Sequence, residues 1–211
     1  KLDLPQQDIE RDLPEDVDVF KIDDETTMLY KIVSLSNVSG FDGIPKGKYS
    51  EAVAAAVAGV QRNIAIIPGQ DHLSIVIVPD FMETIESMFQ RVQFLFVRFP
   101  NLRVLMIQFP GQPGTRYRRS DTLNNKFLAE CTLKFFQFLR SKRLWHWKPR
   151  TGIGMSEKEV MEDAVRRPLI LLCNGLGANV MAYYTVFHMR QDSGIPLATT
   201  LRASMMINPY V

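Results

Sequence analysis

A sharp turn between a strand and a helix can present a nucleophile, and one such turn is predicted here. Its residues are Cys173, Asn174, Gly175, Leu176 and Gly177. Residues 169–172 before it form a continuous apolar run, typical of a strand that is covered on both faces. Residues 178–189 after it have the apolar spacing of a helix. The central position is Gly175, which has no side chain and therefore offers no nucleophile.

The two cysteines are the next residues with nucleophilic potential. Cys173 ends the apolar run, two positions before the centre of the turn, and Cys131 lies among apolar residues of a predicted helix. We expect both thiols to be buried and reduced, because nothing in the sequence demands a disulfide. The side chain of Cys173 should point into the packing of the sheet rather than out of the turn.

Strands and helices alternate on both sides of this turn. Strands are predicted at residues 28–35, 63–67, 73–78, 102–109, 169–172 and 203–207. Helices are predicted at 81–99, 123–139, 156–167 and 178–189, with Ser120 or Asp121 capping the second and Ser156 with Glu159 forming a capping box. Residues 50–60 fit either a helix or a strand. The alternation predicts an α/β fold with a doubly wound, mostly parallel sheet.

Charge is distributed unevenly, although the formal net charge is only +2. Residues 1–30 hold ten acidic and three basic side chains, whereas residues 98–150 hold twelve basic and two acidic ones. We expect residues 1–27 to form an acidic, extended arm, and residues 28–211 to form one domain with an insertion at 141–167. The acidic arm could itself lie across the basic segment.

The basic segment suits a partner with an acidic surface. The candidate contact residues are Arg116, Arg118, Arg119, Lys142, Arg143, Lys148 and Arg150. Another protein chain, such as a cytoskeletal polymer, fits better than nucleic acid, because the bases are spread over a strand end, a loop and a helix. Trp145 and Trp147 lie among them and are expected to close over the core rather than to mark an interface.

Three landmarks give the chain a resemblance to the α/β-hydrolase family over about residues 63–211. The strand at 74–78 is followed by Pro79-Asp80-Phe81, where the family has its oxyanion-hole loop. The strand at 104–109 is followed by a Pro-Gly loop, in which Phe109 and Gln112 depart from the family pattern. The turn at Gly175 lies where the family has its nucleophile elbow, a strand–turn–helix that carries the catalytic serine.

The resemblance implies an oxyanion hole, with the backbone N–H groups of Phe81 and Leu176 as its vestigial donors. It also implies a catalytic histidine after the last strand. The histidines are His72, His146 and His188, and all three precede the strand at 203–207. No acidic residue has a position that would complete a triad. The sheet is expected to be truncated after the strand at 203–207, which would leave an open edge.

The sequence therefore predicts a non-catalytic domain that acts as a structural or protein-binding subunit. We expect no metal, no cofactor and no membrane span, and a cytoplasmic location within a cytoskeletal or other large assembly. One alternative is an esterase or acyltransferase with displaced residues drawn from Ser204, Cys173 and Asp80. Another is a small-ligand receptor that uses the old pocket. A phosphate-binding turn at 175–177 would lack the third glycine of the dinucleotide fingerprint and the lysine of a P-loop.

Overall fold

The computed structural model describes residues 17–34, 73–99, 102–118, 122–145, 156–189 and 201–207. Several predictions lie outside these residues and stay predictions. They are the arm at 1–16, the segments at 50–60 and 63–67, and His72, His146, Trp147, Arg119, Lys148 and Arg150.

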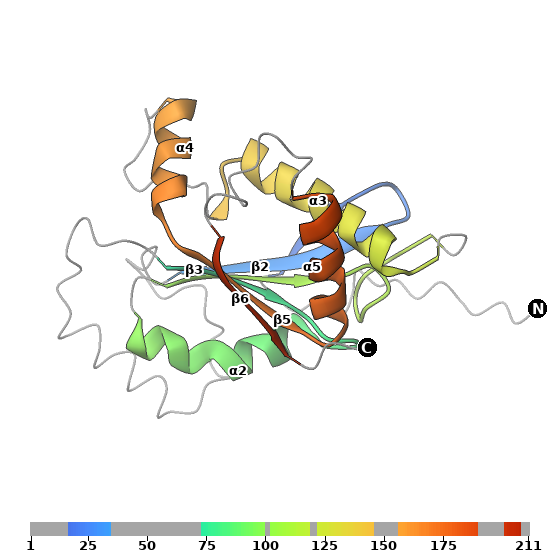
Figure 1. Ribbon diagram of the computed structural model, residues 1–211. Coiled ribbons are helices and arrows are strands. Elements are labelled where there is room, and N and C mark those ends of the chain that lie inside the picture. Colours follow the sequence, from blue (N-terminus) through green and yellow to red (C-terminus); the bar gives the residue numbers. More distant parts are fainter. Residues whose placement is uncertain are drawn as a thin grey trace, which may run out of the picture.

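A six-stranded sheet forms the centre of the described structure (Figure 1). Its strands are β1 (Asp18–Lys21), β2 (Thr27–Ser34), β3 (Ser74–Val78), β4 (Arg103–Gln108), β5 (Leu169–Asn174) and β6 (Leu201–Ile207). They lie in the order β1-β2-β4-β3-β5-β6. The last four strands in this order run parallel, whereas β1 and β2 are antiparallel to their neighbours. The prediction of a mostly parallel α/β sheet is confirmed.

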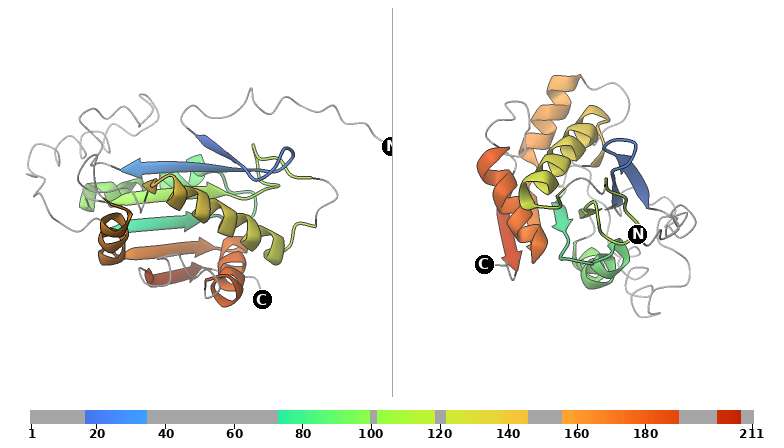
Figure 2. Two further views of the ribbon diagram at one scale, coloured as in Figure 1. Left: turned by 90° about the horizontal axis from the view of Figure 1, so that it is seen from above. Right: turned by 90° about the vertical axis from the view of Figure 1, so that its right-hand side faces the viewer.

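Helices cover both faces of the sheet, as Figures 1 and 2 show. Helix α2 (Ile85–Arg98) lies on one face, and α3 (Asn125–Ser141) and α5 (Leu176–Phe187) lie on the other. Helix α4 (Glu157–Arg166) leads into β5. Because the sheet is covered on both sides, every residue of β3 and β4 is buried.

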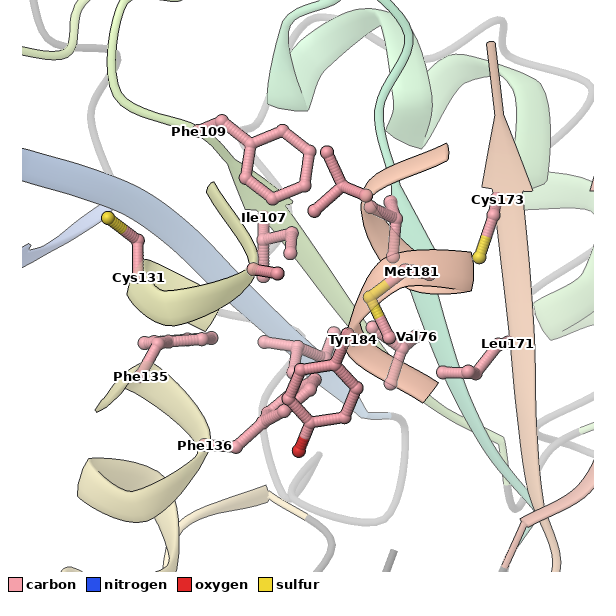
Figure 3. Packing of buried hydrophobic residues seen from close by; sticks show 14 of the residues in the cluster. Val76, Ile107, Phe109, Cys131, Phe135, Phe136, Leu171, Cys173, Met181 and Tyr184 are labelled. Atoms are coloured by element: carbon pink, nitrogen blue, oxygen red, sulfur yellow. The ribbon is translucent and has the colours of Figure 1, made fainter. Parts of the chain in front are cut away.

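Aliphatic and aromatic side chains together fill the core between the sheet and the pair α3 and α5 (Figure 3). Phe135, Phe136 and Tyr184 are fully buried, and the rings of Phe136 and Tyr184 meet edge to face with centroids 5.7 Å apart. Trp145 is also buried, which confirms the prediction that it closes over the core. The indole therefore belongs to the packing and offers no surface to a partner.

The predicted start of α2 and the predicted cap of α3 are wrong. Helix α2 begins at Ile85 rather than at residue 81, because the hydroxyl of Thr84 accepts the backbone N–H of Ser87 and caps the helix. Helix α3 begins at Asn125 rather than at residue 123, and the side chain of Asn124, rather than Ser120 or Asp121, caps it. The later start of α2 leaves residues 79–84 as a loop at the carboxyl edge of the sheet. At α4, the predicted capping box of Ser156 and Glu159 is confirmed.

Residues 18–21 form a strand of the sheet, although the sequence placed them in an acidic arm. Strand β1 pairs antiparallel with β2, and Asp18 lies opposite Tyr30. The ring of Phe20 packs against Phe135 and Phe138 of α3, with centroids 5.4 Å and 4.9 Å away. This apolar anchor escaped the sequence reasoning because acidic residues dominate the composition around it. As a result, β2 rather than β1 corresponds to the predicted first strand.

Candidate functional site

The turn at Gly175 has a backbone conformation that favours glycine. Its φ of 46° and ψ of −114° lie in a region that residues with a side chain rarely adopt. The N–H of Gly175 donates to the carbonyl of Ile207 at 2.9 Å, which ties the turn to the end of β6. The turn therefore places the first residues of α5 at the carboxyl edge of the sheet.

Gly177 allows α5 to approach the end of β3 closely. A Cβ at this position would lie 2.5 Å from the carbonyl oxygen of Pro79 and 2.8 Å from Cγ1 of Val78. The N–H of Gly177 donates to that same carbonyl of Pro79 at 3.0 Å. The loop after β3 and the start of α5 are thus held against each other by backbone contact.

The loop after β3 carries a carboxylate that occupies the space above Gly175. Oδ1 of Asp80 accepts the N–H of Phe81 at 2.6 Å and the N–H of Leu176 at 3.0 Å. We call these two N–H groups, of Phe81 in the loop after β3 and of Leu176 at the start of α5, the cradle. Two converging backbone donors are the arrangement that stabilises an oxyanion in acyl transfer. Here the anion that they hold is a side chain of the protein itself.

The carboxylate of Asp80 and a side chain at position 175 exclude each other. A Cβ placed on Gly175 would lie 1.9 Å from Oδ1 of Asp80 and 2.2 Å from its Cγ. Both distances are far below any real contact between a carbon and these atoms. A serine at position 175 would therefore have to expel Asp80 from the cradle.

Gln112 fixes the position of Asp80 from the neighbouring loop. Its Nε2 donates to the carbonyl of Asp80 at 2.7 Å, and its Oε1 accepts the N–H of Phe109 at 2.7 Å. The side chain is buried, and its hydrogen bond with Phe109 is shielded from water, whereas the one to Asp80 is partly buried. A carboxylate oxygen of Glu83 accepts the N–H of Asp80 at 2.9 Å and holds the loop from its other side. Sequence reasoning noted Gln112 only as a departure from the family pattern and missed this role.

Two apolar side chains project into solvent beside the cradle. Phe81 is 65% exposed and Met82 is 56% exposed. Met82 has a φ of 61°, which is uncommon for a residue with a side chain. The hydrogen bonds around Asp80 hold the loop in the conformation that displays both side chains.

The residues considered for displaced chemistry are not brought together. Cys173 is fully buried on β5, and desolvation raises the pKa of its thiol to about 12. Ser204 lies opposite Leu171 on β6, three residues before the carboxyl end of the strand at Ile207. At a rise of about 3.3 Å per residue, that places it roughly 10 Å from the edge where the cradle lies. Asp80 is held in the cradle.

His188 is the one histidine among the described residues, and it lies at the far end of α5. The helix from Leu176 to Phe187 separates it from the cradle by about 18 Å at 1.5 Å per residue. Its ring packs beside Tyr183 and Tyr184, with centroids about 6 Å away. His188 therefore cannot serve as a base for a group at Gly175.

The basic residues predicted to bind a partner lie at two opposite edges of the sheet. Arg116 and Arg118 are exposed at the carboxyl edge of β4, where the carbonyl of Arg116 accepts the N–H of Thr27. Arg118 forms an ion pair with Glu25 there. Lys142 and Arg143 are exposed after the end of α3, at the amino edge, where Arg103 donates to the carbonyl of Trp145. The described members of the set form no single surface.

No group of three or more histidine, cysteine, aspartate or glutamate side chains among the described residues is placed to hold a metal ion. Within the same residues, no helix combines the length and the hydropathy that crossing a membrane requires.

Comparison with known proteins gives matches in solved structures alone. No family model matches the chain, and no curated protein matches it. The α/β-hydrolase domain-containing protein 10 from mouse is 10% identical with a TM-score of 0.44, over 90% of this chain and 48% of that one. A probable hydrolytic enzyme from Pseudomonas aeruginosa is 11% identical with a TM-score of 0.44, over 92% of this chain and 40% of that one. The chain thus spans less than half the length of either protein.

The architecture defines the class of fold. A mostly parallel six-stranded sheet, helices on both faces and a strand–turn–helix at Gly175 together make an α/β-hydrolase-like fold. Fold alone does not determine activity, because function depends on the residues at the site.

Proposed function

We propose that this chain is a non-catalytic α/β-hydrolase-like domain that serves as a structural or protein-binding subunit of a larger assembly. The observation that carries the proposal is the occupation of the cradle. Gly175 supplies no nucleophile, and the carboxylate of Asp80 fills the space above it. Acyl transfer needs a nucleophile, a base in hydrogen-bond reach and a free oxyanion hole. The described residues around Gly175 provide none of these.

Exposed apolar surface supports the protein-binding part of the proposal. Met205, Met206 and Ile207 of β6 are 57%, 41% and 44% exposed. Successive residues of a strand point to opposite faces, so both faces of β6 carry exposed apolar side chains. An apolar strand at the edge of a sheet readily pairs with another chain. Phe81 and Met82 add a second exposed apolar surface, in the loop at the carboxyl end of β3.

The proposed partner is another protein chain with an acidic surface, and a cytoskeletal polymer is one such partner. The exposed bases at the two edges of the sheet support this choice. The thiols of Cys131 and Cys173 are buried and are not joined by disulfide bonds, which agrees with a reducing compartment such as the cytoplasm. We propose that the assembly lies there. Binding should weaken as salt rises, and binding that salt leaves unchanged would argue against a charged contact.

A fluorophosphonate probe tests the absence of catalysis. These probes label activated serine nucleophiles, so we expect no adduct in the intact mass of the wild-type protein. Ser204→Ala serves as the matched control, because Ser204 is the serine named for displaced chemistry. An adduct on the wild-type protein that disappears in Ser204→Ala would refute the proposal and establish a displaced nucleophile.

A further inference from the structure

Several hydrogen bonds hold the loop after β3 at Asp80. Its backbone is bound by Gln112 and Glu83, and its carboxylate by the N–H groups of Phe81 and Leu176. The second of these two donors comes from α5, 96 residues further along the chain. One side chain therefore joins the loop after β3 to the helix after β5.

We propose that Asp80 is an internal ligand that closes the cradle to external anions and fastens the loop after β3 to α5. Three observations carry the inference. Oδ1 of Asp80 accepts both converging donors, at 2.6 Å and 3.0 Å. Glycine at position 175 leaves the space that the carboxylate fills. Gln112 and Glu83 hold the backbone of Asp80, so the carboxylate is preorganised for that space.

Closure of the cradle by Asp80 affects the binding of small anions and the conformation of the loop after β3. Free acids and other small anions should not compete with Asp80, because an attached carboxylate has a very high effective concentration at its own site. The same contact holds Phe81 and Met82 in their exposed positions. The inference deepens the proposed function and rests on it, because a permanently filled cradle is compatible only with a site that has lost its catalysis.

Removal of the carboxylate should convert the cradle into a site for added acetate. We expect Asp80→Ala to lower Tm by about 5 °C, since a charge-assisted hydrogen-bond pair is lost. Sodium acetate at about 100 mM should then raise the Tm of this variant by roughly 3 °C more than sodium chloride at equal ionic strength. The wild-type protein should show no such difference. Asp24→Ala is the matched control, because Asp24 is an exposed carboxylate outside the cradle.

Three results would overturn the inference. One is an Asp80→Ala variant that is as stable as the wild type. The second is a rise in the Tm of this variant that is equal in acetate and in chloride. The third is a specific rise in Tm with acetate that the wild type shares. If Asp80→Ala does not fold, the amide protons of Phe81 and Leu176 in the wild type give the same test by NMR. They should move together on acidification with one common midpoint, and separate midpoints would contradict a shared carboxylate. None of these readouts depends on probe labelling, so failure here and failure of the proposed function can be distinguished.

Discussion

The cradle and strand β6 lie at neighbouring positions of the same sheet. They differ in what they present: hydrogen-bonded polar groups at the cradle and exposed apolar side chains on β6. At the cradle, Oδ1 of Asp80 satisfies two backbone donors, and Gln112 and Glu83 complete the network. On β6, Met205 and Ile207 expose apolar side chains on one face, and Met206 does so on the other. The carboxylate of Asp80 fills the region where hydrolases of this fold perform chemistry, whereas apolar side chains of β6 are exposed among the described residues.

This difference affects which of the two regions can bind another molecule. A closed polar network stabilises one conformation and leaves no room for a ligand. An open apolar strand gains free energy when another surface covers it, at about 25 cal/mol per Å² of apolar area. If the domain acts through contacts with other chains, those contacts should depend on β6 rather than on the cradle.

The largest predicted effect is a difference in reactivity between the thiol of Cys173 on β5 and a cysteine introduced on β6. Burial raises the pKa of Cys173 to about 12, so its thiolate fraction at pH 8 should be about three orders of magnitude below that of an exposed cysteine. Met205→Cys should therefore react with iodoacetamide at least 1,000-fold faster than Cys173, on the order of the thiolate ratio. Both rates can be followed by peptide mass spectrometry.

The pH dependence of the two thiols should differ as well. Thiolate at Cys173 should increase about tenfold per pH unit from 7 to 10, because the group titrates well above this range. The rate at Met205→Cys should level off above about pH 9, since an exposed thiol is then ionised. Equal rates at the two positions would mean that β5 is not covered as described.

The next largest effect is expected for Gly177→Ala. The added Cβ would lie 2.5 Å from the carbonyl oxygen of Pro79, and backbone atoms cannot give way as a flexible side chain can. We expect a loss of about 3 kcal/mol in the free energy of unfolding, at the upper end for overpacking. Urea denaturation measures it. Ala182→Ser, on the exposed side of α5, is the control and should change stability by less than about 0.5 kcal/mol.

The smallest predicted effect is on β6 itself. Met206→Lys should change the free energy of unfolding by less than about 0.5 kcal/mol, because the side chain is already exposed. The same substitution should weaken any association through β6, which sedimentation at increasing protein concentration or with a purified partner would detect. A destabilisation above about 2 kcal/mol would show that Met206 is packed within the domain and that β6 is not open.

Apolar patterning was sufficient to predict the central turn and all strands of the described sheet except β1. The continuous apolar runs of β3 and β4 identify strands that are buried on both faces, whereas in β5 buried residues alternate with partly buried ones. The five residues at 173–177 predict the turn that the structure contains. Strand β1 was missed because its apolar anchor is a single phenylalanine among acidic residues. The described bases were grouped by sequence proximity, whereas α3 separates them by its whole length.

The occupied cradle could not be predicted in the same way. The resemblance suggested the N–H groups of Phe81 and Leu176 as vestigial donors of an oxyanion hole. That these groups once formed an oxyanion hole stays a prediction. The position of the Asp80 side chain depends on Gln112 and Glu83. Gln112 lies on a different loop, and Glu83 belongs to the loop of Asp80 only because α2 starts at Ile85 and not at residue 81. The one available signal was a carboxylate directly before the expected donor Phe81, opposite a glycine that leaves space.

A thermodynamic cycle between Asp80 and Gly175 tests the central claim most directly. Gly175→Ala should destabilise the wild type, both because φ is positive and because the Cβ would lie 1.9 Å from Oδ1 of Asp80. In an Asp80→Ala background only the first cause remains, so the same substitution should cost about 2 kcal/mol less. A coupling of that size would show that the carboxylate occupies the space above Gly175. Equal costs in the two backgrounds would contradict the account, because Asp80 would then lie elsewhere.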